Sequence, residues 1–292
     1  MFRLARPVRG GEEVNLPSRL QLSSLEISEY VENGFVIVRD LLDKEDVNRL
    51  REVCDDLALG RLPTVATAKV SLGGETIQES DMVLAGMTDE ERLRSVLNVY
   101  YPGWVSEVYE NLIVHAGLGE IVDSLVAGRV GGWDGRSERI LDYVFYKPSG
   151  ELGRAWHQDA TYLEADCRTL TSVSIVVDES RVDNGCLWLL PGSHQPGGLF
   201  PMGEHGKPGE YDHARESYGF DDATEVPVLA QPGDAVFFDG HLLHRSGENS
   251  SADSRRAIVM HWLDKETRHV WRFPNDPVWP PESSTSVWRT EE

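Results

Sequence analysis

The sequence predicts a mainly β protein with helices in its N-terminal part, and three observations support this fold class. From about residue 138 the chain breaks into short runs rich in β-branched and aromatic residues, separated by Asn-Gly, Pro-Gly and Ser-Gly turns. This texture is typical of a β-sandwich or barrel. Before that point, apolar residues recur at helical spacing. The length of 292 residues fits one large domain, and a hydrophobic content of 40% suffices for a core.

The first third of the chain is expected to be helical. "SLEISEYVENGF" predicts a short amphipathic helix that ends at Gly34, and "FVIVRD" predicts a strand directly after it. "DKEDVNRLREVCDDLALG" predicts a second helix, with Asp43 as N-cap and Gly60 as the stop. "WVSEVYENLIVHAGL" and "LGEIVDSLVAG" predict two more helices. Residues 61–90 are polar without a clear period, so we expect a long loop or lid there.

The remainder is expected to be the β core. The predicted strands lie in "RILDYVFYK", "RAWHQDAT", "LTSVSIVVD", "NGCLWLLPG", "PVLAQPGDAVFFDG", "HLLHRSG" and "RRAIVMHWL". Residues 200–224 are charged and glycine-rich, which indicates an insertion over one mouth of the sandwich. We therefore predict a single domain over residues 1–292, with a helical part at about 20–130, a β core at about 138–265 and an irregular tail at 270–292.

Charge and cysteine content narrow the function classes. The net charge of −21 disfavours nucleic acid as a partner, because an acidic surface repels phosphate backbones. No apolar run approaches the ~18 residues of a membrane span, and the N-terminal stretch lacks an apolar signal region. Cys54, Cys167 and Cys186 are odd in number and widely spaced, which favours buried thiols over disulfides or a thiolate zinc site. The sequence therefore predicts a cytoplasmic protein without a membrane partner.

The stretch "AWHQDATYLEADCRTL" carries the first candidate site. His157 and Asp159 are two positions apart in a run that reads as a strand. Residues i and i+2 of a strand point to the same face, so an imidazole and a carboxylate are expected to project side by side.

A second histidine follows in "FFDGHLLHRSGENSSADSRRAIVMHWL". His241 and His244 are three apart and face opposite ways on a strand, whereas His244 and Ser246 share a face. Residues 247–253 read as a turn, after which the chain is expected to return antiparallel. That return predicts Arg255 or its neighbour Arg256 beside Ser246.

Two histidines and one carboxylate form the triad of non-heme Fe(II) oxygenases, which leaves coordination positions open for a bidentate co-substrate and for O₂. An arginine near the distal histidine suits a dicarboxylate, because guanidinium binds a carboxylate through two hydrogen bonds.

At this point the sequence resembles the phytanoyl-CoA dioxygenase family of Fe(II)/2-oxoglutarate-dependent oxygenases, over most of the chain. The resemblance is carried by "YVENGFVIVRDLLDKEDVNRLRE", "WHQD", "DNGCLWLLPGSH" and "HRSGENSSADSRR", in this order. The spacing also agrees: 244 − 159 gives 85 positions from aspartate to distal histidine, and 255 − 244 gives 11 from that histidine to the arginine.

The resemblance implies roles for particular residues. His157, Asp159 and His244 match the iron ligands. Arg255 matches the arginine that holds the C5 carboxylate of 2-oxoglutarate, and Ser246 matches its hydroxyl helper.

The resemblance also extends to Lys147-Pro148 in "YVFYKPSG", and it implies co-substrate contacts at Tyr143 and Ile175. It implies a double-stranded β-helix, or jelly roll, as the fold, and Fe(II), 2-oxoglutarate and O₂ as cofactor and co-substrates.

Several alternatives stay open. Hydroxylation of an unactivated C–H bond in a small metabolite, such as an intermediate of secondary metabolism, is the default outcome, with succinate and CO₂ as co-products. Epimerisation, desaturation or cyclisation require only another fate of the substrate radical. A cupin-like metal-binding protein without 2-oxoglutarate turnover is the alternative of a different class. The sequence does not predict the substrate or the oligomeric state.

The remaining charged residues have ordinary interpretations. Lys69, Arg92, Arg94 and Arg154 are possible anchors for an anionic substrate or simply exposed charges. His194 is expected to be a turn residue, and His241 and His261 packed or surface histidines.

Overall fold

The protein consists of two antiparallel β-sheets with a layer of helices against the larger sheet. The computed structural model describes residues 21–62, 69–72, 75–78, 86–115, 117–195, 197–207, 209–212 and 215–271. The helices are α1 (Ser24–Asn33), α2 (Lys44–Ala58), α4 (Asp89–Ser95), α5 (Glu107–His115) and α6 (Leu118–Arg129), with short 3₁₀ turns η1 (Pro102–Trp104), η2 (Asp159–Tyr162) and η3 (Cys167–Thr169).

The strands form two sheets and two short pairs. The large sheet has the order β1 (Phe35–Val38), β13 (Ala235–Asp239), β8 (Thr171–Val176), β15 (Arg255–Asp264), β5 (Ser137–Lys147), β4 (Val96–Tyr100), β2 (Lys69–Leu72), β3 (Glu75–Gln78). The small sheet has the order β12 (Val226–Pro227), β9 (Leu187–Leu189), β14 (His244–Ser246), β6 (Arg154–His157). The short pairs are β10 (Met202–Gly203) with β11 (Glu216–Ser217), and β16 (Val270–Trp271) with β7 (Leu163–Glu164).

This connectivity is a double-stranded β-helix. Along the chain β5, β8, β13 and β15 enter the large sheet, and β6, β9, β12 and β14 enter the small sheet that faces it. The predicted fold class, a mainly β jelly roll with N-terminal helices, is confirmed.

The first two predicted helices, α1 and α2, are present with the predicted caps, whereas α4 was not predicted. Ser23 caps α1 in a capping box with Glu26, and Gly34 ends the helix in the left-handed conformation, with φ of 85°. The Asp43 side chain caps α2 by accepting hydrogen bonds from the backbone N–H groups of residues 45 and 46. α5 lies within its predicted segment, and α6 extends one residue beyond its own, to Arg129.

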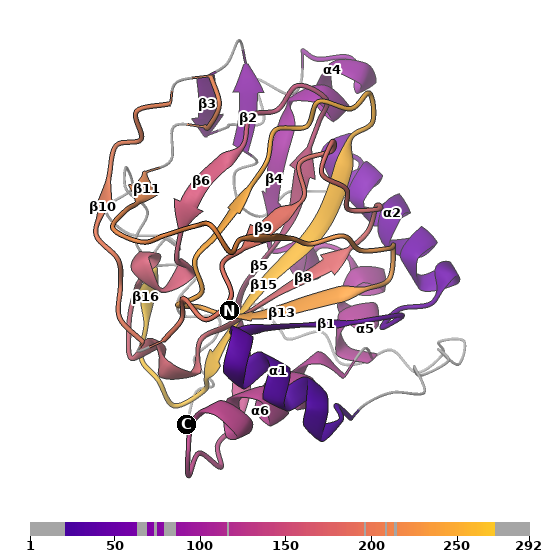
Figure 1. Cartoon of the computed structure of the whole chain (residues 1–292). Coiled ribbons are helices and arrows are strands. Elements are labelled where there is room, and N and C mark those ends of the chain that lie inside the picture. Colours follow the sequence, from indigo (N-terminus) through magenta and orange to yellow (C-terminus); the bar gives the residue numbers. More distant parts are fainter. Residues whose placement is uncertain are drawn as a thin grey trace.

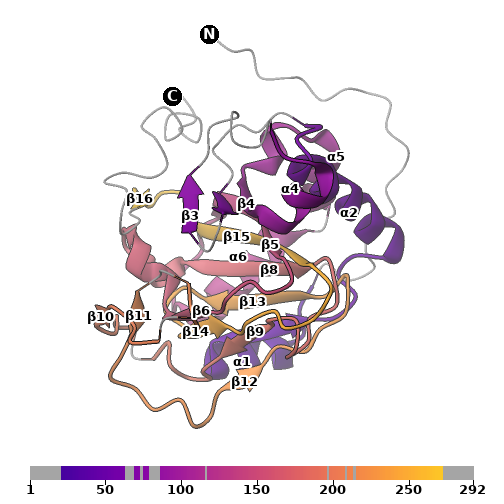
Figure 2. The same ribbon diagram turned by 90° about the horizontal axis from the view of Figure 1, so that it is seen from above.

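The layers are visible in two orthogonal views. Figure 1 shows α2 and α5 to one side of the large sheet, and Figure 2 shows β9, β12 and β14 on its other side. The main core lies between helices and large sheet and includes Leu50, Val122, Ile175 and Phe237, all fully buried. A second cluster, including Val176 and Leu189, fills the space between the sheets. The sandwich interior is therefore separated from the helical layer by the large sheet.

The predicted loop at 61–90 is wrong in part. Residues 69–72 and 75–78 form strands β2 and β3, which extend the large sheet beyond β4. Four-residue strands at a sheet edge carry too few side chains for a period to be read, and this explains the error. The rest of 63–85, the N-terminal arm up to residue 20 and the tail after residue 271 lie outside the described residues.

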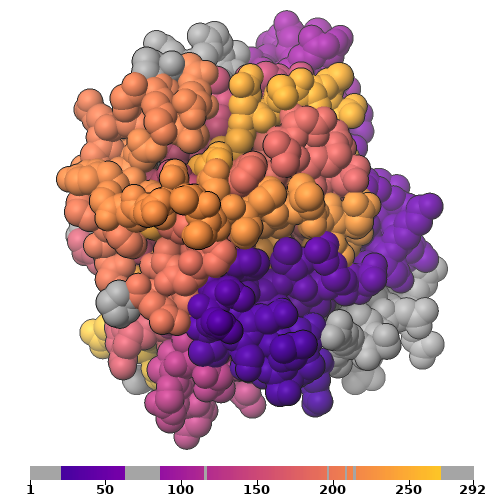
Figure 3. All heavy atoms as spheres, viewed as in Figure 1, coloured from indigo at the N-terminus to yellow at the C-terminus, as the bar shows by residue number. Residues whose placement is uncertain are grey.

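The orange residues of the segment around 200–240 form a band at the surface beside the indigo N-terminal helix (Figure 3).

Cys54, Cys167 and Cys186 are free and buried, as predicted. None of the described helices is long and apolar enough to cross a membrane.

Candidate metal centre

The first two candidate ligands come from consecutive but different elements. His157 is the last residue of β6, and Asp159 is the first residue of the 3₁₀ turn η2. The expectation that both lie on one strand is therefore wrong. The chain turns at residue 159, so the carboxylate reaches the imidazole by a change of backbone direction and not by strand alternation.

The third candidate ligand comes from the neighbouring strand. His244 opens β14 and lies directly opposite His157 in the antiparallel register. The Nε2 atoms of His157 and His244 lie 3.9 and 3.6 Å from Oδ1 of Asp159. One ligand atom from each of the three residues lies within 4.8 Å of the others, and all three side chains are buried. Two imidazole nitrogens and one carboxylate oxygen at such spacing fit a divalent transition metal.

The outer ring nitrogens prepare both histidines as ligands. Nδ1 of His157 lies 2.8 Å from the carbonyl oxygen of Ala155, and Nδ1 of His244 lies 2.9 Å from that of Leu242. Carbonyl oxygens only accept hydrogen bonds, so each Nδ1 carries the proton and each Nε2 presents a lone pair to the site. Burial and the nearby His244 lower the pKa of His157 to about 3, which keeps its imidazole neutral near pH 7.

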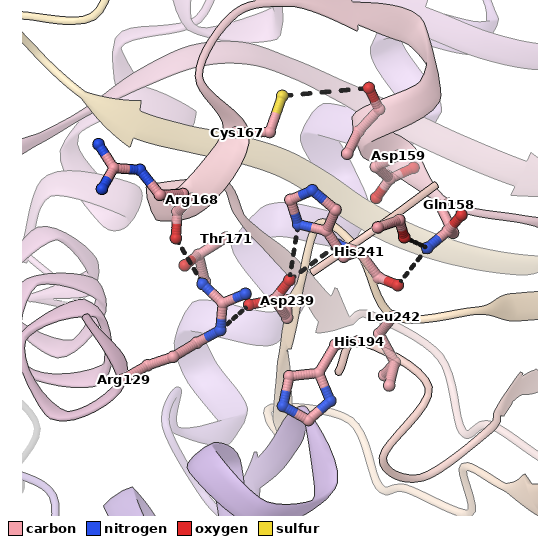
Figure 4. Close-up of polar contacts among 12 residues, drawn as sticks. Arg129, Gln158, Asp159, Cys167, Arg168, Thr171, His194, Asp239, His241 and Leu242 are labelled. Carbon is pink, nitrogen blue, oxygen red and sulfur yellow. Dashed lines mark hydrogen bonds and ion pairs between the residues drawn. The ribbon is translucent and has the colours of Figure 1, made fainter. Parts of the chain in front are cut away.

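The loops that carry the ligands are joined by short hydrogen bonds. The Gln158 side-chain amide donates to the carbonyl oxygen of His241 at 2.7 Å, and the Ala160 N–H donates to that of Gly240 at 2.9 Å. These bonds connect the turn containing Asp159 to the segment that leads into His244 (Figure 4).

A buried ion pair anchors the same segment. Asp239 accepts from the His241 N–H at 2.8 Å, and its other oxygen lies 2.5 Å from Nε of Arg129 on α6. Figure 4 shows Asp239 held between Arg129 and His241, with His194 on the α1 side. His194 is buried, and its Nε2 lies 3.2 Å from the carbonyl oxygen of Val31 in α1. His194 and His241 therefore belong to the structural support of the loop, and His241 is packed in the interior as predicted.

Sequence reasoning missed two residues that contact Asp159. Ser172 Oγ lies 2.6 Å from Oδ2 of Asp159, and Nδ1 of His261 lies 2.9 Å from the same hydroxyl. Ser172 and His261 are opposite each other across β8 and β15. Ser172 and His261 come together because β8 pairs with β15, and a local sequence motif cannot show pairing between residues so far apart in the chain.

Arg255 lies in the interior near Ser246, but not through the pairing that the sequence suggested. β14 belongs to the small sheet and β15 to the large one, so the two strands face each other across the sandwich. Arg255 is 7% exposed and donates to the carbonyl oxygens of Asn184 and Gly185. Burial lowers the pKa of Arg255, and within the described chain it has no ion pair.

Arg256 points away from Arg255, toward the helical layer and not to solvent. Its guanidinium bonds Asp178 and Asp55 at the junction of the large sheet with α2. The register that makes Arg255 the inward residue is therefore correct.

Lys147 is a second cation in this part of the interior. It is paired with Arg255 across β5 and β15 and is 1% exposed. Its Nζ donates to the Leu152 carbonyl oxygen at 2.7 Å and lies 3.4 Å from Ser246 Oγ. A Cβ on Gly185 would come within 2.3 Å of the lysine side chain, so glycine makes room for it. Burial and then Arg255 lower the pKa of Lys147 to about 7.

The two remaining candidate residues, Tyr143 and Ile175, lie on opposite faces of the large sheet. Tyr143 on β5 points into the interior, and burial, Tyr100 and then Asp159 raise the pKa of its phenol. Ile175 packs fully buried among the core residues under the helices. The large sheet separates Ile175 from the metal centre, and the expected co-substrate contact at this position is wrong. On β8 the interior face belongs to Ser172 and, by strand alternation, Ser174.

One of the four candidate anchors lies at this site. Arg154, three residues before His157, bonds Asp212 at 3.2 Å and interacts electrostatically with Tyr100, Tyr143 and Tyr162. Its backbone N–H donates to Ser246 Oγ. Arg154 thus brings a guanidinium next to several phenol groups.

The anchors Arg92 and Arg94 are occupied elsewhere. Arg92 donates to the Leu59 carbonyl oxygen, and Arg94 pairs with Glu90 on the surface. The Lys69 side chain lies outside the described residues.

The chain matches the family model "Phytanoyl-CoA dioxygenase (PhyH)" over residues 30–257. Phytanoyl-CoA dioxygenase 1 of Oryza sativa subsp. japonica is 35% identical over 146 residues, which are 47% of this chain and 50% of the rice protein. The matched part therefore spans about half the length of that curated relative.

Solved structures share the fold. The non-heme α-ketoglutarate-dependent carbocyclase SnoK from nogalamycin biosynthesis is 17% identical with a TM-score of 0.63, over 92% of this chain and 93% of that one. EvdO2 of Micromonospora carbonacea var. aurantiaca, in complex with 2-oxoglutarate, is 21% identical with a TM-score of 0.60, over 88% and 95%.

Proposed function

Because the chain belongs to the phytanoyl-CoA dioxygenase family of Fe(II)/2-oxoglutarate-dependent oxygenases, we propose that it oxidises an unactivated C–H bond of a small-molecule metabolite, most simply by hydroxylation. The observation that carries the proposal is the buried group of His157, Asp159 and His244, whose ligand atoms converge on one point between the sheets.

The ligand group fits Fe(II). Both imidazoles present Nε2, their Nδ1 protons are held by carbonyl oxygens, and the carboxylate is the one anionic donor. Three protein ligands leave positions for a co-substrate, which distinguishes the site from a closed structural one. Iron, when bound, would supply O₂ activation coupled to the oxidative decarboxylation of 2-oxoglutarate to succinate and CO₂.

The co-substrate's distant carboxylate is assigned to the cationic end of the interior. Arg255 offers N–H donors that meet only backbone carbonyls in the described chain, and a carboxylate is the stronger acceptor. Lys147 lies opposite Arg255 in the register, and Ser246 lies beside Lys147. These three groups form a donor set for one end of a dicarboxylate. Tyr143 is on the same face of β5 as Lys147, interacts electrostatically with Asp159 and is assigned to orient the co-substrate.

The substrate is assigned to the mouth lined by Arg154 and the tyrosines. A guanidinium and several phenol hydroxyls suit an oxygen-rich molecule. The named structural neighbours include a carbocyclase and the epimerase SnoN, so one scaffold supports different reaction outcomes. Epimerisation, desaturation and cyclisation therefore remain alternatives to hydroxylation within the same chemistry.

The test is release of succinate from 2-oxoglutarate by the purified protein with Fe(II) and O₂, screened against a metabolite library. We expect a basal release that a correct substrate stimulates, and none in an Asp159→Ala protein. A folded parent protein that binds Fe(II) but forms no succinate with any library member would favour the cupin-like alternative.

A further inference from the structure

The two oxygens of Asp159 have different surroundings. Oδ1 faces Nε2 of both His157 and His244, at 3.9 and 3.6 Å. Oδ2 faces away from them and accepts a hydrogen bond from Ser172 Oγ at 2.6 Å. One oxygen is therefore directed to the point where the histidines converge, and the other is occupied by a protein donor.

The hydrogen-bond direction follows from the chemistry of the groups. An ionised carboxylate only accepts, so the single Ser172 proton is directed to Asp159. Ser172 Oγ also lies 2.9 Å from Nδ1 of His261, which must then carry a proton and donate to the hydroxyl. The chain of donors runs from His261 through Ser172 to Asp159 and fixes the His261 tautomer.

The positions of this pair are set by the large sheet. Ser172 and His261 are direct partners in the β8–β15 register, and they are 0% and 4% exposed. The side chains before and after Ser172 on β8 point to the opposite face, where Val173 belongs to the helix-side core. The donor pair is thus buried within the large sheet, whereas Asp159 lies on a short turn.

We propose that Ser172 and His261 are positioning residues which hold Asp159 as a one-oxygen ligand, with Oδ1 toward the metal and Oδ2 bound by the protein. A carboxylate free to rotate can bind a metal through both oxygens and so fill a further coordination position. This family of sites needs that position for co-substrate and O₂. The inference rests on the proposed function, because it concerns the same metal.

The experiment measures Mn(II) binding to the metal-free protein by calorimetry. Ser172→Ala and His261→Leu are each expected to weaken Mn(II) binding by about 10- to 100-fold, the usual effect of losing an outer hydrogen bond to a ligand. The double variant should lose little more than either single one, because both residues act through the same hydrogen bond. His261→Asn, whose amide N–H takes the place of Nδ1–H, should recover part of the affinity.

Ser180→Ala is the matched control. Ser180 is a buried serine whose hydroxyl donates to the Val228 carbonyl oxygen, and it lies outside the metal centre. Its removal costs a similar hydrogen bond but is expected to leave the Mn(II) affinity unchanged. Thermal unfolding of each variant identifies any protein that fails to fold.

A spectroscopic readout addresses geometry directly. The Co(II)-loaded parent and Ser172→Ala proteins are compared by the intensity of their d–d absorption, which falls as coordination number rises. We expect weaker absorption in Ser172→Ala, because its Asp159 can bind through both oxygens. Unchanged Mn(II) affinity and unchanged Co(II) spectra in folded Ser172→Ala would overturn the inference. Failure of the parent to bind Mn(II) at all, or binding insensitive to Asp159→Ala, would instead overturn the proposed function.

Discussion

Asp239 and Asp159 are both buried beside histidines, but they differ in their other partners. Asp239 is 0% exposed and forms an ion pair with Arg129, so its charge is neutralised inside the protein. Asp159 is 8% exposed and meets Ser172 and three imidazoles, and within the described chain no arginine or lysine pairs with it. A buried carboxylate without a cation is costly unless a cation is added from outside. Asp239 therefore has a structural role, whereas Asp159 is suited to bind a metal ion.

The neighbouring arginines of β15 repeat this contrast. Arg256 has two carboxylate partners at the helix layer, and these raise its pKa although burial opposes them. Arg255 is almost fully buried with backbone carbonyl acceptors, and burial lowers its pKa. The paired charges lie between the large sheet and the helices. The charges that lack a partner of opposite sign lie between the two sheets, where a metal and a dicarboxylate are proposed to bind.

The largest expected effect is that replacing Asp159 lowers metal affinity, whereas replacing Asp239 lowers stability. Asp159→Ala should weaken Mn(II) binding by more than about 100-fold, beyond the usual loss for an outer-sphere change, and abolish succinate release. Its metal-free form should unfold closer to the parent's temperature than Asp239→Ala does, because no arginine or lysine of the described chain loses an ion pair.

Asp239→Ala should do the opposite. It leaves Arg129, whose side chain is 16% exposed, without its carboxylate, which typically costs about 3–5 kcal/mol. We expect a lower midpoint in thermal and urea unfolding, with Mn(II) affinity changed far less than in Asp159→Ala. Two variants that lose metal and stability equally would show that the contrast between the two sites is false.

The second expected effect separates the two arginines. Arg255→Ala should raise KM for 2-oxoglutarate by roughly 30-fold to several thousand-fold, since losing one side of a buried charged contact costs about 2–5 kcal/mol. Iron affinity should change little. Arg256→Ala should lower the unfolding midpoint and leave KM within about 3-fold, or ~0.6 kcal/mol.

Initial-rate kinetics and thermal unfolding of both proteins check this pair. If Arg256→Ala gives the large KM effect, the assignment of faces on β15 is reversed. If neither variant changes KM, 2-oxoglutarate is not held at this end of the interior.

The sequence was informative where function depends on short motifs and less so where it depends on strand register. The ligands His157, Asp159 and His244 were found from residue type and spacing, although the backbone around Asp159 turns where a strand was expected. Ser172 and His261 escaped because their contact is made by pairing of β8 with β15.

The error at Ile175 has the same origin. Which face a strand residue occupies depends on where pairing begins, and a shift of one position exchanges the faces. Ile175 packs in the core under the helices, and Ser172 faces the interior between the sheets. The sequence shows that side chains of β8 alternate between two faces, but it does not show which face is which.

The smallest expected effect concerns Lys147 and the pH dependence of co-substrate binding. Its pKa of about 7, lowered from 10.5 by burial and Arg255, lies below the value in the unfolded chain. Arg154 acts in the same direction, and Glu151 and Asp212 oppose it. Between about pH 7 and 10.5 the unfolded chain holds more protons on this lysine than the folded one. The metal-free protein should therefore gain stability as pH rises through this window, by at most ~1.4 kcal/mol per pH unit.

A bound dicarboxylate reverses the preference of the folded protein for neutral Lys147. Its negative charge beside Lys147 favours the ammonium form, so binding should take up a proton above pH 7. We expect the Kd for 2-oxoglutarate to rise with pH above 7, by up to about 10-fold per unit, and calorimetry in buffers of different ionisation enthalpy to detect the proton. Lys147→Met should bind about 10-fold more weakly at pH 7, a loss of ~1.4 kcal/mol, and lose the pH dependence. A parent Kd that is flat between pH 7 and 9, with no proton uptake, would remove Lys147 from the carboxylate site and leave Arg255 and Ser246 to hold the co-substrate.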